Sequence, residues 1–484
     1  VVMQYKIKSV FNFLEITMQK NWNFENSYLT LPNIFYSKTR AEKFPNLKVL
    51  LKNKNLIDNL DLKNDDFDKI VLESINNGEI NSFSQAYAGH QFGHFTILGD
   101  GRATLLGEHI NNNNERFDIQ LKGSGKTPYS RNGDGKGTLK SMLREYIVSE
   151  AMHNLDIKTT RSLAILNTGE KIQRETYEEG GILVRVAKSH IRVGTFQLAS
   201  LSKKKNDIEE LLEYTIKRLH PEILNEADKY LKFFEKITAD QINLIINWQR
   251  VGFIHGVMNT DNMSISGETI DYGPCAFLDE YNPNKVFSSI DKNGRYAFNN
   301  QPKIALWNLA RLAETFLHLI DVNEELAIKK IENILMRYEV KYHDLWLEMM
   351  KNKIGINQDH AKDKDLIKEL LDLMQVFKLD YTNTFIEIEN DNFKKFDFMH
   401  EWIAKLNLRK QLNKNDKKVK FSNPKIIPRN HILENVLNEC KNGNYKNLSR
   451  FISILKNPYS SDIPEEFIKE PTNDEKVYET FCGT

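Results

Sequence analysis

The segment from His255 to Asp279 reads HGVMNTDNMSISGETIDYGPCAFLD, with glycines and serines among three aspartates, two asparagines and a cysteine. Asn262 follows His255 by seven residues, and Asp271 stands within the run Ile-Asp-Tyr-Gly at 270–273. An amide oxygen together with a carboxylate oxygen suits a hard six-coordinate cation such as Mg²⁺ or Mn²⁺. We therefore interpret the segment as a functional site and not as a polar loop between helices.

A similar order of residues occurs in kinase-like phosphotransferases of the antibiotic-modifying type, which carry His-Gly-Asp, then Asn, then Ile-Asp-aromatic-Gly. This chain departs from that order at Val257, because the base of a kinase is an aspartate two residues after the histidine. An aspartate stands instead at Asp261, directly before Asn262. Either the chain is a pseudokinase without chemistry, or the base has moved and the reaction differs.

A lysine and a glutamate upstream match another part of the kinase pattern. The stretch FDIQLK (117–122) alternates apolar and polar residues, which predicts a half-buried strand ending at Lys122. Glu145 follows in a helix that we expect to open near Thr138. In protein kinases a strand lysine binds phosphate and a helix glutamate holds that lysine. Taken singly, an exposed edge lysine and a surface glutamate are the more common alternatives, and the segment from His255 onward decides against them.

Glycines are frequent in GSGKTPYSRNGDGKG (123–137), and its first five residues, GSGKT, resemble part of a P-loop. A P-loop has four residues between its first glycine and the Gly-Lys pair, so that its backbone amides wrap the phosphates. With Gly125 and Lys126 as that pair, the first glycine would stand at 120, where the residue is Gln120. A P-loop is therefore excluded. We expect this loop to contact phosphate, with a mobile turn as the alternative.

Arginines add to the positive charge of the predicted site. In LVRVAKSHIRVG (183–194), Arg185 lies on a predicted strand and Arg192 just after it. The guanidinium fork binds phosphate through two parallel hydrogen bonds, although any one arginine is usually a salt-bridged surface residue. The other cations that we group with this site are Lys122, Lys126, Arg102 and Arg131. Together they exceed what a simple kinase needs for its phosphates.

The predicted elements change character along the chain. The first half consists of short strands and glycine turns, whereas from about Asn206 the pattern is helical, as in DQINLIINWQRVGFI behind a predicted N-cap at Thr238. We predict an α+β class and a bilobal protein-kinase-like fold with a strand-rich N-lobe, a helical C-lobe, additional C-terminal helices and an extended tail. The expected regions are a doubtful N-terminal extension at 1–17, an N-lobe with nucleotide-binding loops at 18–200, a helical C-lobe with the catalytic and metal loop at 201–330, a helical region at 331–455 and a tail with Cys482 at 456–484.

Composition narrows the class of protein further. The chain has 484 residues, a formal net charge of +1 and no apolar run near the roughly 18–20 residues that cross a bilayer. We therefore expect neither a nucleic-acid partner nor a membrane partner. Three cysteines are too few for a secreted disulfide framework, which favours a reducing compartment and a cytoplasmic location.

Several long motifs run through most of the chain: FENSYLTLP (24–32), SQAYAGHQFGHF (84–95), LGDGRA (98–103), QLKGSGKTPYSRNGDGKG (120–137), REYIVSEAMHNLDI (144–157), the segment 255–279, NPKIIPRNHILE (423–434) and TFCGT (480–484). Together they resemble the selenoprotein O family of protein adenylyltransferases, which has a pseudokinase fold. Many members end in a cysteine followed two residues later by selenocysteine, whereas this chain ends Cys482-Gly483-Thr484. The chain therefore resembles a bacterial-type member without selenocysteine.

The resemblance implies transfer of AMP from ATP to Ser, Thr or Tyr hydroxyls of protein substrates, with Mg²⁺ or Mn²⁺ as the metal and pyrophosphate as the leaving group. The nucleotide of that family is flipped relative to a kinase, so that the β- and γ-phosphates enter a basic pocket. By the same resemblance Asp261 accepts the proton, Asn262 and Asp271 bind the metal, and Glu145 pairs with Lys122. The implied ATP-binding residues are Gly99, Gly101, Arg102, Lys122, Asp134, Gly135, Arg185, Arg192 and Asp271.

Two cysteines suggest redox control. Cys275 lies four residues past Asp271, where a kinase has its activation segment, and Cys482 lies on the tail. We hypothesise a redox-labile disulfide between them, with burial of Cys275 as a small hydrophobic residue as an equal alternative.

Two other functions remain open from the sequence. A kinase-like phosphotransferase is disfavoured by Val257 in the position of the base. An inert nucleotide-binding pseudokinase scaffold is disfavoured because Lys122, Glu145, Asn262 and Asp271 are all retained.

Overall fold

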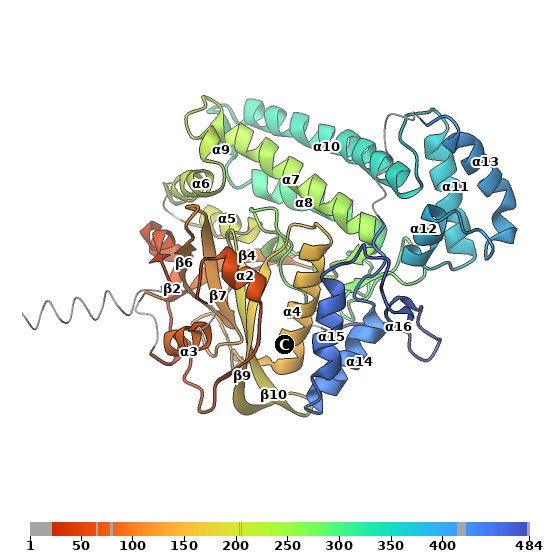
Figure 1. Cartoon of the computed structure of the whole chain (residues 1–484). Helices are drawn as coiled ribbons and strands as arrows, with labels where there is room; N and C mark the ends of the chain where they lie inside the picture. Colours follow the sequence, from red (N-terminus) through yellow and green to blue (C-terminus); the bar gives the residue numbers. More distant parts are fainter. Residues whose placement is uncertain are drawn as a thin grey trace, which may run out of the picture.

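The structure is a computed structural model that describes residues 22–63, 66–77, 81–202, 204, 206–413 and 423–481. Residues 1–17 and Cys482, for which the sequence predicts an extension and a redox partner, lie outside these ranges. Within them the chain combines a large antiparallel sheet with fifteen α-helices (Figure 1). The predicted combination of α and β structure is therefore confirmed.

The described strands form one sheet of ten strands and one of two. Neighbours in the large sheet run β2-β4-β6-β7-β10-β9-β3, while β1 pairs with β6, β5 with β4 and β8 with β10. The strands are β1 (Phe24–Glu25), β2 (Tyr36–Lys38), β3 (Lys48–Lys52), β4 (Phe83–Gln91), β5 (His94–Gly99), β6 (Ala103–Ile110), β7 (Arg116–Lys122), β8 (Gly137–Thr138), β9 (Arg161–Gln173), β10 (Tyr177–Ala187), β11 (Phe253–Ile254) and β12 (Ala276–Phe277).

Strand β7 lies between β6 and β10, and it differs from the predicted half-buried strand. Its apolar residues Ile119 and Leu121 are buried, but so are the alternating polar residues Asp118, Gln120 and Lys122. The alternative of an exposed edge lysine is therefore wrong. Because buried polar groups need hydrogen-bond partners, one face of β7 packs into apolar core and the other face carries a polar network.

The helices surround the sheet in groups. Helices α7, α8 and α10 pack together, α11 packs with α13, and α14 and α15 lie against α4, which covers β9 and β10 (Figure 1). The helices are α2 (Lys54–Asn59), α3 (Phe67–Asn77), α4 (Leu139–Asn154), α5 (Val193–Ser200), α6 (Asn206–Leu219), α7 (Lys229–Val251), α8 (Gln301–Ala313), α9 (Leu317–Ile320), α10 (Glu324–Lys353), α11 (Asp363–Val376), α12 (Tyr381–Glu389), α13 (His400–Lys410), α14 (Asn430–Lys441), α15 (Lys446–Leu455) and α16 (Glu465–Ile468). Among the described helices, none is long and apolar enough to cross a bilayer.

Two helix starts test the sequence analysis directly. Helix α4 begins where predicted, because the Thr138 hydroxyl accepts the backbone N–H of Ser141 at 3.1 Å and caps the first turn. The predicted N-cap Thr238 is wrong, since it lies inside α7, which starts at Lys229. Buried Phe233 extends the apolar face of α7 upstream of the stretch on which that prediction rested.

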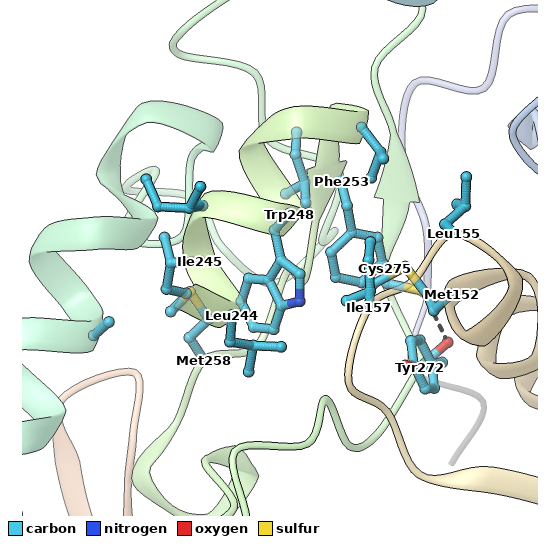
Figure 2. Packing of buried hydrophobic residues seen from close by; sticks show 14 of the residues in the cluster. Met152, Leu155, Ile157, Leu244, Ile245, Trp248, Phe253, Met258, Tyr272 and Cys275 are labelled. Carbon is cyan, nitrogen blue, oxygen red and sulfur yellow. Dashed lines mark hydrogen bonds between the residues drawn. The ribbon is translucent and has the colours of Figure 1, made fainter. Parts of the chain in front are cut away.

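The segment that opened the sequence analysis follows α7. Gly252 ends this helix in the left-handed region (φ +73°), where glycine is favoured. The chain then passes through β11, a short 3-10 helix at Thr260–Asn262, and β12. Trp248, Phe253 and Tyr272 pack edge to face beneath it, as Figure 2 shows. An aromatic core therefore supports the polar segment.

Glu268, in the same segment, gives a stability prediction. Its carboxylate accepts the backbone N–H of Lys188 (3.0 Å) and the hydroxyl of Ser266 (2.7 Å), and burial raises its pKa from 4.5 to about 7. A carboxyl whose pKa rises on folding makes the native state less stable as pH increases from the unfolded pKa to the folded one. The parent should therefore lose up to about 3 kcal/mol of unfolding free energy between pH 4.5 and pH 8 through this group, and Glu268→Gln should not. The stability of the variant relative to the parent should rise by that amount over the same range.

Urea unfolding of both proteins at pH 5 and pH 8 measures this difference. Glu401→Gln, at an exposed position on α13, is the matched control and should change the free energy of unfolding by less than about 1 kcal/mol. An equal effect of Glu268→Gln at both pH values would contradict the prediction.

Candidate active site

Lys122, at the end of β7, is the centre of a buried ion-pair cluster. Its Nζ lies 2.5 Å from Oε2 of Glu145 on α4 and also contacts Oδ1 of Asp271. Arg185 on β10 lies 3.2 Å from the other Glu145 oxygen and 3.6 Å from Asp271 Oδ1. Two cations thus face two carboxylates. The fold brings together four residues that the sequence analysis selected, although Lys122 and Asp271 are 149 positions apart.

Gln120 connects this cluster to a second buried ion pair. Its Oε1 accepts Arg185 Nε at 3.1 Å, and its Nε2 donates to Asp100 Oδ2 at 3.0 Å. The other oxygen of Asp100 lies 3.3 Å from Arg192 Nη2. Gln120 and Lys122 of β7 therefore belong to one network in which each buried charge has an opposite charge or an amide beside it.

Arg192 links the sheet to the Asp261 segment. It directly precedes α5 and is fully buried. Its Nη1 donates to the backbone oxygen of Asp261 at 3.0 Å, and its guanidinium lies over the Tyr87 ring at 4.4 Å. A buried cation requires such partners, because desolvation of an unpaired charge is costly. Arg192 therefore ties the peptide group of Asp261 to the residue that precedes α5.

Asp271 has an unusual backbone and a strongly acidic carboxyl. Its φ of +69° lies in the left-handed region, which aspartate tolerates better than most residues. Burial by itself would raise the pKa of this carboxyl, but Lys122, Arg185 and Arg192 hold that pKa well below its usual range. The side chain is 26% exposed. Asp271 is therefore an ionised carboxylate that is still accessible to a ligand.

Asn262 complements Asp271 as a possible cation ligand. Its Nδ2 donates to the backbone oxygen of Val257 at 3.1 Å, so the amide oxygen is the atom that remains for a cation. An amide oxygen and an ionised carboxylate fit Mg²⁺ or Mn²⁺. Within the described part of the chain, no group of three or more His, Cys, Asp or Glu side chains could hold a metal. A cation here would therefore complete its coordination with water or with a bound ligand.

His255 holds the two halves of the segment together. Its Nε2 donates to the backbone oxygen of Ile270 (2.9 Å), and its Nδ1 accepts the backbone N–H of Val257 (3.3 Å). Burial lowers the pKa of His255, which agrees with the neutral ring that these two bonds require. Val257 itself is buried and apolar. The histidine therefore has a structural role, and position 257 offers no proton acceptor.

Asp261 presents a carboxylate with an unsatisfied oxygen. Burial raises the pKa of this carboxyl to about 6, although Arg192 acts in the opposite direction. Among the described residues, buried Oδ1 has no hydrogen-bond partner, while Oδ2 lies 3.5 Å from Gln91 Nε2. Buried carboxylate oxygens without a partner are uncommon. Asp261 is therefore a buried carboxyl with one oxygen for which the described residues supply no donor.

A cleft of about 670 Å³ opens beside Asp261. A Cβ at Gly135 (φ +67°) would lie 2.0 Å from the backbone oxygen of Gly125, so two loops meet there at a distance that only glycine permits. Among the described residues that line this cleft, several predicted site residues are not found: Lys122, Lys126, Arg131, Glu145, Arg185, Arg192, Asn262 and Asp271. The lining residues that the sequence analysis did select are Gly99, Gly101, Arg102, Asp134, Gly135 and Asp261.

Other residues of the cleft were not predicted from the sequence. Tyr87 and Gln91 line it from β4, inside the quoted motif SQAYAGHQFGHF, where their alternation with alanine and histidine was an available signal. Arg174 also lines it and holds Asp134 through two bonds of 2.8 and 3.0 Å. No motif pointed to Arg174, because its partner lies 40 positions away.

Arg144, next to Glu145, connects α4 to more distant parts of the chain. It donates to the backbone oxygens of Gly273 (3.1 Å) and Cys275 (2.7 Å) and pairs with Glu434 of α14 (2.7 Å). Helix α4, whose Glu145 pairs with Lys122, is therefore fixed both to the segment after Asp271 and to the C-terminal helix α14.

Cys275 lies in the aromatic core that Figure 2 shows, with its Sγ donating to the backbone oxygen of Tyr272 at 3.4 Å. Burial raises the pKa of this thiol to about 12. In this conformation the protonated thiol packs as a small apolar group. The tail nevertheless passes close by, because the Thr480 hydroxyl donates to the backbone oxygen of Pro274 at 2.6 Å.

Comparison with known proteins identifies the family of this chain. A family model described as protein adenylyltransferase SelO matches residues 18–456. A protein of Pelagibacter ubique named protein nucleotidyltransferase YdiU is 49% identical over 487 residues, which cover 96% of this chain and 100% of the relative. Two proteins of the same name are 47% identical to this chain. The alignment with the one from Clostridium perfringens covers 96% of this chain and 98% of the relative, and that with the one from Brevibacillus brevis covers 97% and 99%. The chain therefore belongs to the SelO family of protein adenylyltransferases and is an enzyme that transfers nucleotides.

Proposed function

We propose that the enzyme transfers AMP from ATP to Ser, Thr or Tyr hydroxyls of proteins, with Mg²⁺ or Mn²⁺ and with release of pyrophosphate. The contrast between Asp261 and Val257 carries this proposal. Asp261 borders the cleft with one carboxylate oxygen that has no partner among the described residues. Val257, in the position of a kinase base, is buried and apolar. The proton acceptor has therefore moved and has not been lost.

In the described part of the chain, the fold is that of a bilobal kinase-like protein that divides near residues 200, 330 and 455 into an N-lobe, a C-lobe, C-terminal helices and a tail. The order of functional groups supports this division, since the strand lysine and helix glutamate precede the amide and carboxylate ligands as in a kinase. All described strands of the large sheet end by Ala187, and the helices from α6 onward follow.

The buried cations bind the phosphates of ATP. Lys122 contacts phosphate and is held by Glu145, while Arg185 and Arg192 bind the buried end of the triphosphate. Donors that are fixed before the reaction stabilise the charge that develops on the leaving pyrophosphate. The loops with Gly99, Gly101, Arg102, Asp134 and Gly135 complete the nucleotide site. The hydrogen bonds of Gln120 to Arg185 and Asp100 keep this cationic wall in place.

Asn262 and Asp271 hold the metal ion. Lys122 and Arg185 lie beside one oxygen of Asp271, which leaves the other oxygen for the cation. When bound, the cation neutralises phosphate charge and supports departure of pyrophosphate.

Asp261 accepts the proton of the substrate hydroxyl. The hydroxyl oxygen forms a bond to the α-phosphorus of ATP, and the bond from that phosphorus to the oxygen bridging to the β-phosphate breaks. The bonding electrons leave with pyrophosphate, and the proton passes to the Asp261 carboxylate. Burial raises the pKa of this carboxyl to about 6, which makes it a stronger base than an exposed aspartate.

Labelled ATP tests the proposal. The enzyme is incubated with Mg²⁺ or Mn²⁺ and with ATP that carries its label at the α- or the γ-phosphate, and label on protein is measured. Label from the α-phosphate alone supports AMP transfer. Label from the γ-phosphate alone would establish a kinase, and no label from either would favour a nucleotide-binding scaffold.

Cys275 and Cys482 form a redox-labile disulfide that acts on this site. The contact of Thr480 with Pro274 supports the pairing, because it places the tail two residues before Cys482 against the neighbour of Cys275. The thiol of Cys275 is buried, so pairing requires the tail and this segment to move. Peptide mapping after mild oxidation tests the pairing. Two separate thiols after this treatment would refute it.

A further inference from the structure

The end of strand β4 and the residue that follows it contact the Asp261 segment at two alternate positions. The backbone N–H of His90 donates to the Thr260 hydroxyl at 2.7 Å, and the backbone N–H of Phe92 donates to Asn259 Oδ1 at 3.0 Å. These segments are about 170 positions apart in the chain. Backbone donors depend on the path of the strand, so the contact fixes the position of the segment relative to the sheet.

A closed ring of hydrogen bonds strengthens this contact. The Thr260 hydroxyl accepts from the His90 N–H and donates to Gln197 Oε1 on α5 at 2.6 Å, while Gln197 Nε2 donates to His90 Nδ1 at 2.9 Å. Thr260 and Gln197 are buried. Helix α5 also approaches β4 so closely that a Cβ at Gly194 would lie 1.9 Å from the backbone oxygen of Ala88. Three elements are therefore joined directly beside Asp261.

Gly89 provides the space for the Asp261 side chain. A Cβ at Gly89 would lie 2.3 Å from Asp261 Oδ1 and 2.9 Å from its Cβ. Oδ1 is the oxygen that has no partner among the described residues. The φ of Gly89 is not in the left-handed region, so alanine is compatible with the backbone there. The glycine is required by its contact with Asp261 and not by the strand.

Gln91 provides a side-chain donor to the same carboxylate. Its Nε2 lies 3.5 Å from Asp261 Oδ2, and the residue lines the cleft. Because side chains alternate along a strand, Gly89 and Gln91 share the face of β4 that is turned toward Asp261. Gly89 leaves room for buried Oδ1, and Gln91 contacts Oδ2, so the two residues together set the orientation of the carboxylate.

We propose that the end of β4 together with the next residue, Gly89–Phe92, is a positioning element for AMP transfer that fixes the orientation of the Asp261 carboxylate beside the cleft through Gly89 and Gln91. This inference rests on the proposed role of Asp261 as proton acceptor. The positioning residues act through Asp261, so their loss should lower kcat while leaving the KM for ATP nearly unchanged.

The test uses the full-length enzyme, α-labelled ATP and an unfolded acceptor protein rich in Ser, Thr and Tyr. Gln91→Leu should lower kcat about tenfold, and Gly89→Ala about 100-fold because it displaces the carboxylate. In both variants the KM for ATP should stay within about twofold of the parent. Gln375→Leu and Ile97→Ala, at exposed positions on α11 and β5, are matched controls that should keep the parental kcat. Parental kcat in Gln91→Leu and Gly89→Ala would overturn the proposal.

A second measurement does not depend on activity. Gly89→Ala is introduced into the parent and into Asp261→Ala, and the melting temperature of each protein is measured. The decrease should be larger in the parent, because Asp261→Ala lacks the Oδ1 atom that a Cβ at position 89 would approach to 2.3 Å. Equal shifts in the two backgrounds would refute the contact. If the parent transfers no α-label, the proposed function fails, whereas the melting temperatures still decide whether Gly89 and Asp261 are coupled.

Discussion

Replacing Asp271 by alanine is expected to reduce label transfer from α-labelled ATP by about 1,000-fold or more, because the metal loses its only carboxylate ligand from the proposed pair. The substitution also removes a negative charge from the cluster around Lys122 and Arg185. With one carboxylate fewer, Lys122 is drawn fully to Glu145, which lies 2.5 Å away. Both effects act on the nucleotide site, so metal-dependent binding of ATP should weaken as well.

Rates of label incorporation at several Mg²⁺ and Mn²⁺ concentrations measure this effect. Asp271→Asn separates the two causes, since it keeps an oxygen ligand but lowers the charge, and it should retain more activity than Asp271→Ala at high metal concentration. Asp365→Ala, at an exposed position on α11, is the matched control and should behave like the parent. Full activity of Asp271→Ala would refute the assignment of the site.

The parts of the site that could be predicted are those with a local sequence pattern. Lys122 ends an alternating strand, Glu145 follows on a capped helix, and Asn262 and Asp271 keep a fixed spacing after His255. Such spacings reflect hydrogen bonds and ligand geometry within short segments, which one sequence records directly. The contact of Lys122 with both Glu145 and Asp271 agrees with this reasoning.

Burial was harder to predict than secondary structure. The alternation in β7 correctly indicates a strand, but it suggested that the polar side would be exposed. In the fold that side faces Arg185 and Asp100, which come from neighbouring parts of the sheet. A polar residue on a central strand and one on an edge strand give the same local pattern. Only the pairing of β7 with β6 and β10 distinguishes them.

Several other contacts could not be predicted because the two partners are distant in the chain. Gln91 meets Asp261 across 170 positions, and Arg144 meets Glu434 across 290. Nothing in the local backbone explains why position 89 is glycine, because its φ is one that other residues also adopt. Glycine is needed there only because the folded strand packs against the Asp261 side chain.

Replacing Arg192 by leucine is expected to abolish AMP transfer and to lower the free energy of unfolding by about 3–5 kcal/mol, the usual cost of leaving one partner of a buried ion pair alone. Arg192 is fully buried, pairs with Asp100 at 3.3 Å and holds the backbone oxygen of Asp261 at 3.0 Å. Its loss leaves the Asp100 carboxylate buried without a cation and frees the peptide group of Asp261. Urea unfolding and α-label incorporation measure the two effects separately.

The double variant Arg192→Leu with Asp100→Leu distinguishes stability from function. Because it removes both buried charges, it should recover part of the lost unfolding free energy, yet it should remain inactive, since no cation faces the triphosphate at that position. Arg337→Leu, an exposed arginine that pairs with Glu235 on the surface, is the matched control and should change stability by less than about 1 kcal/mol. Recovery of activity together with stability would show that Arg192 acts only through folding, and its proposed contact with the phosphates would then be wrong.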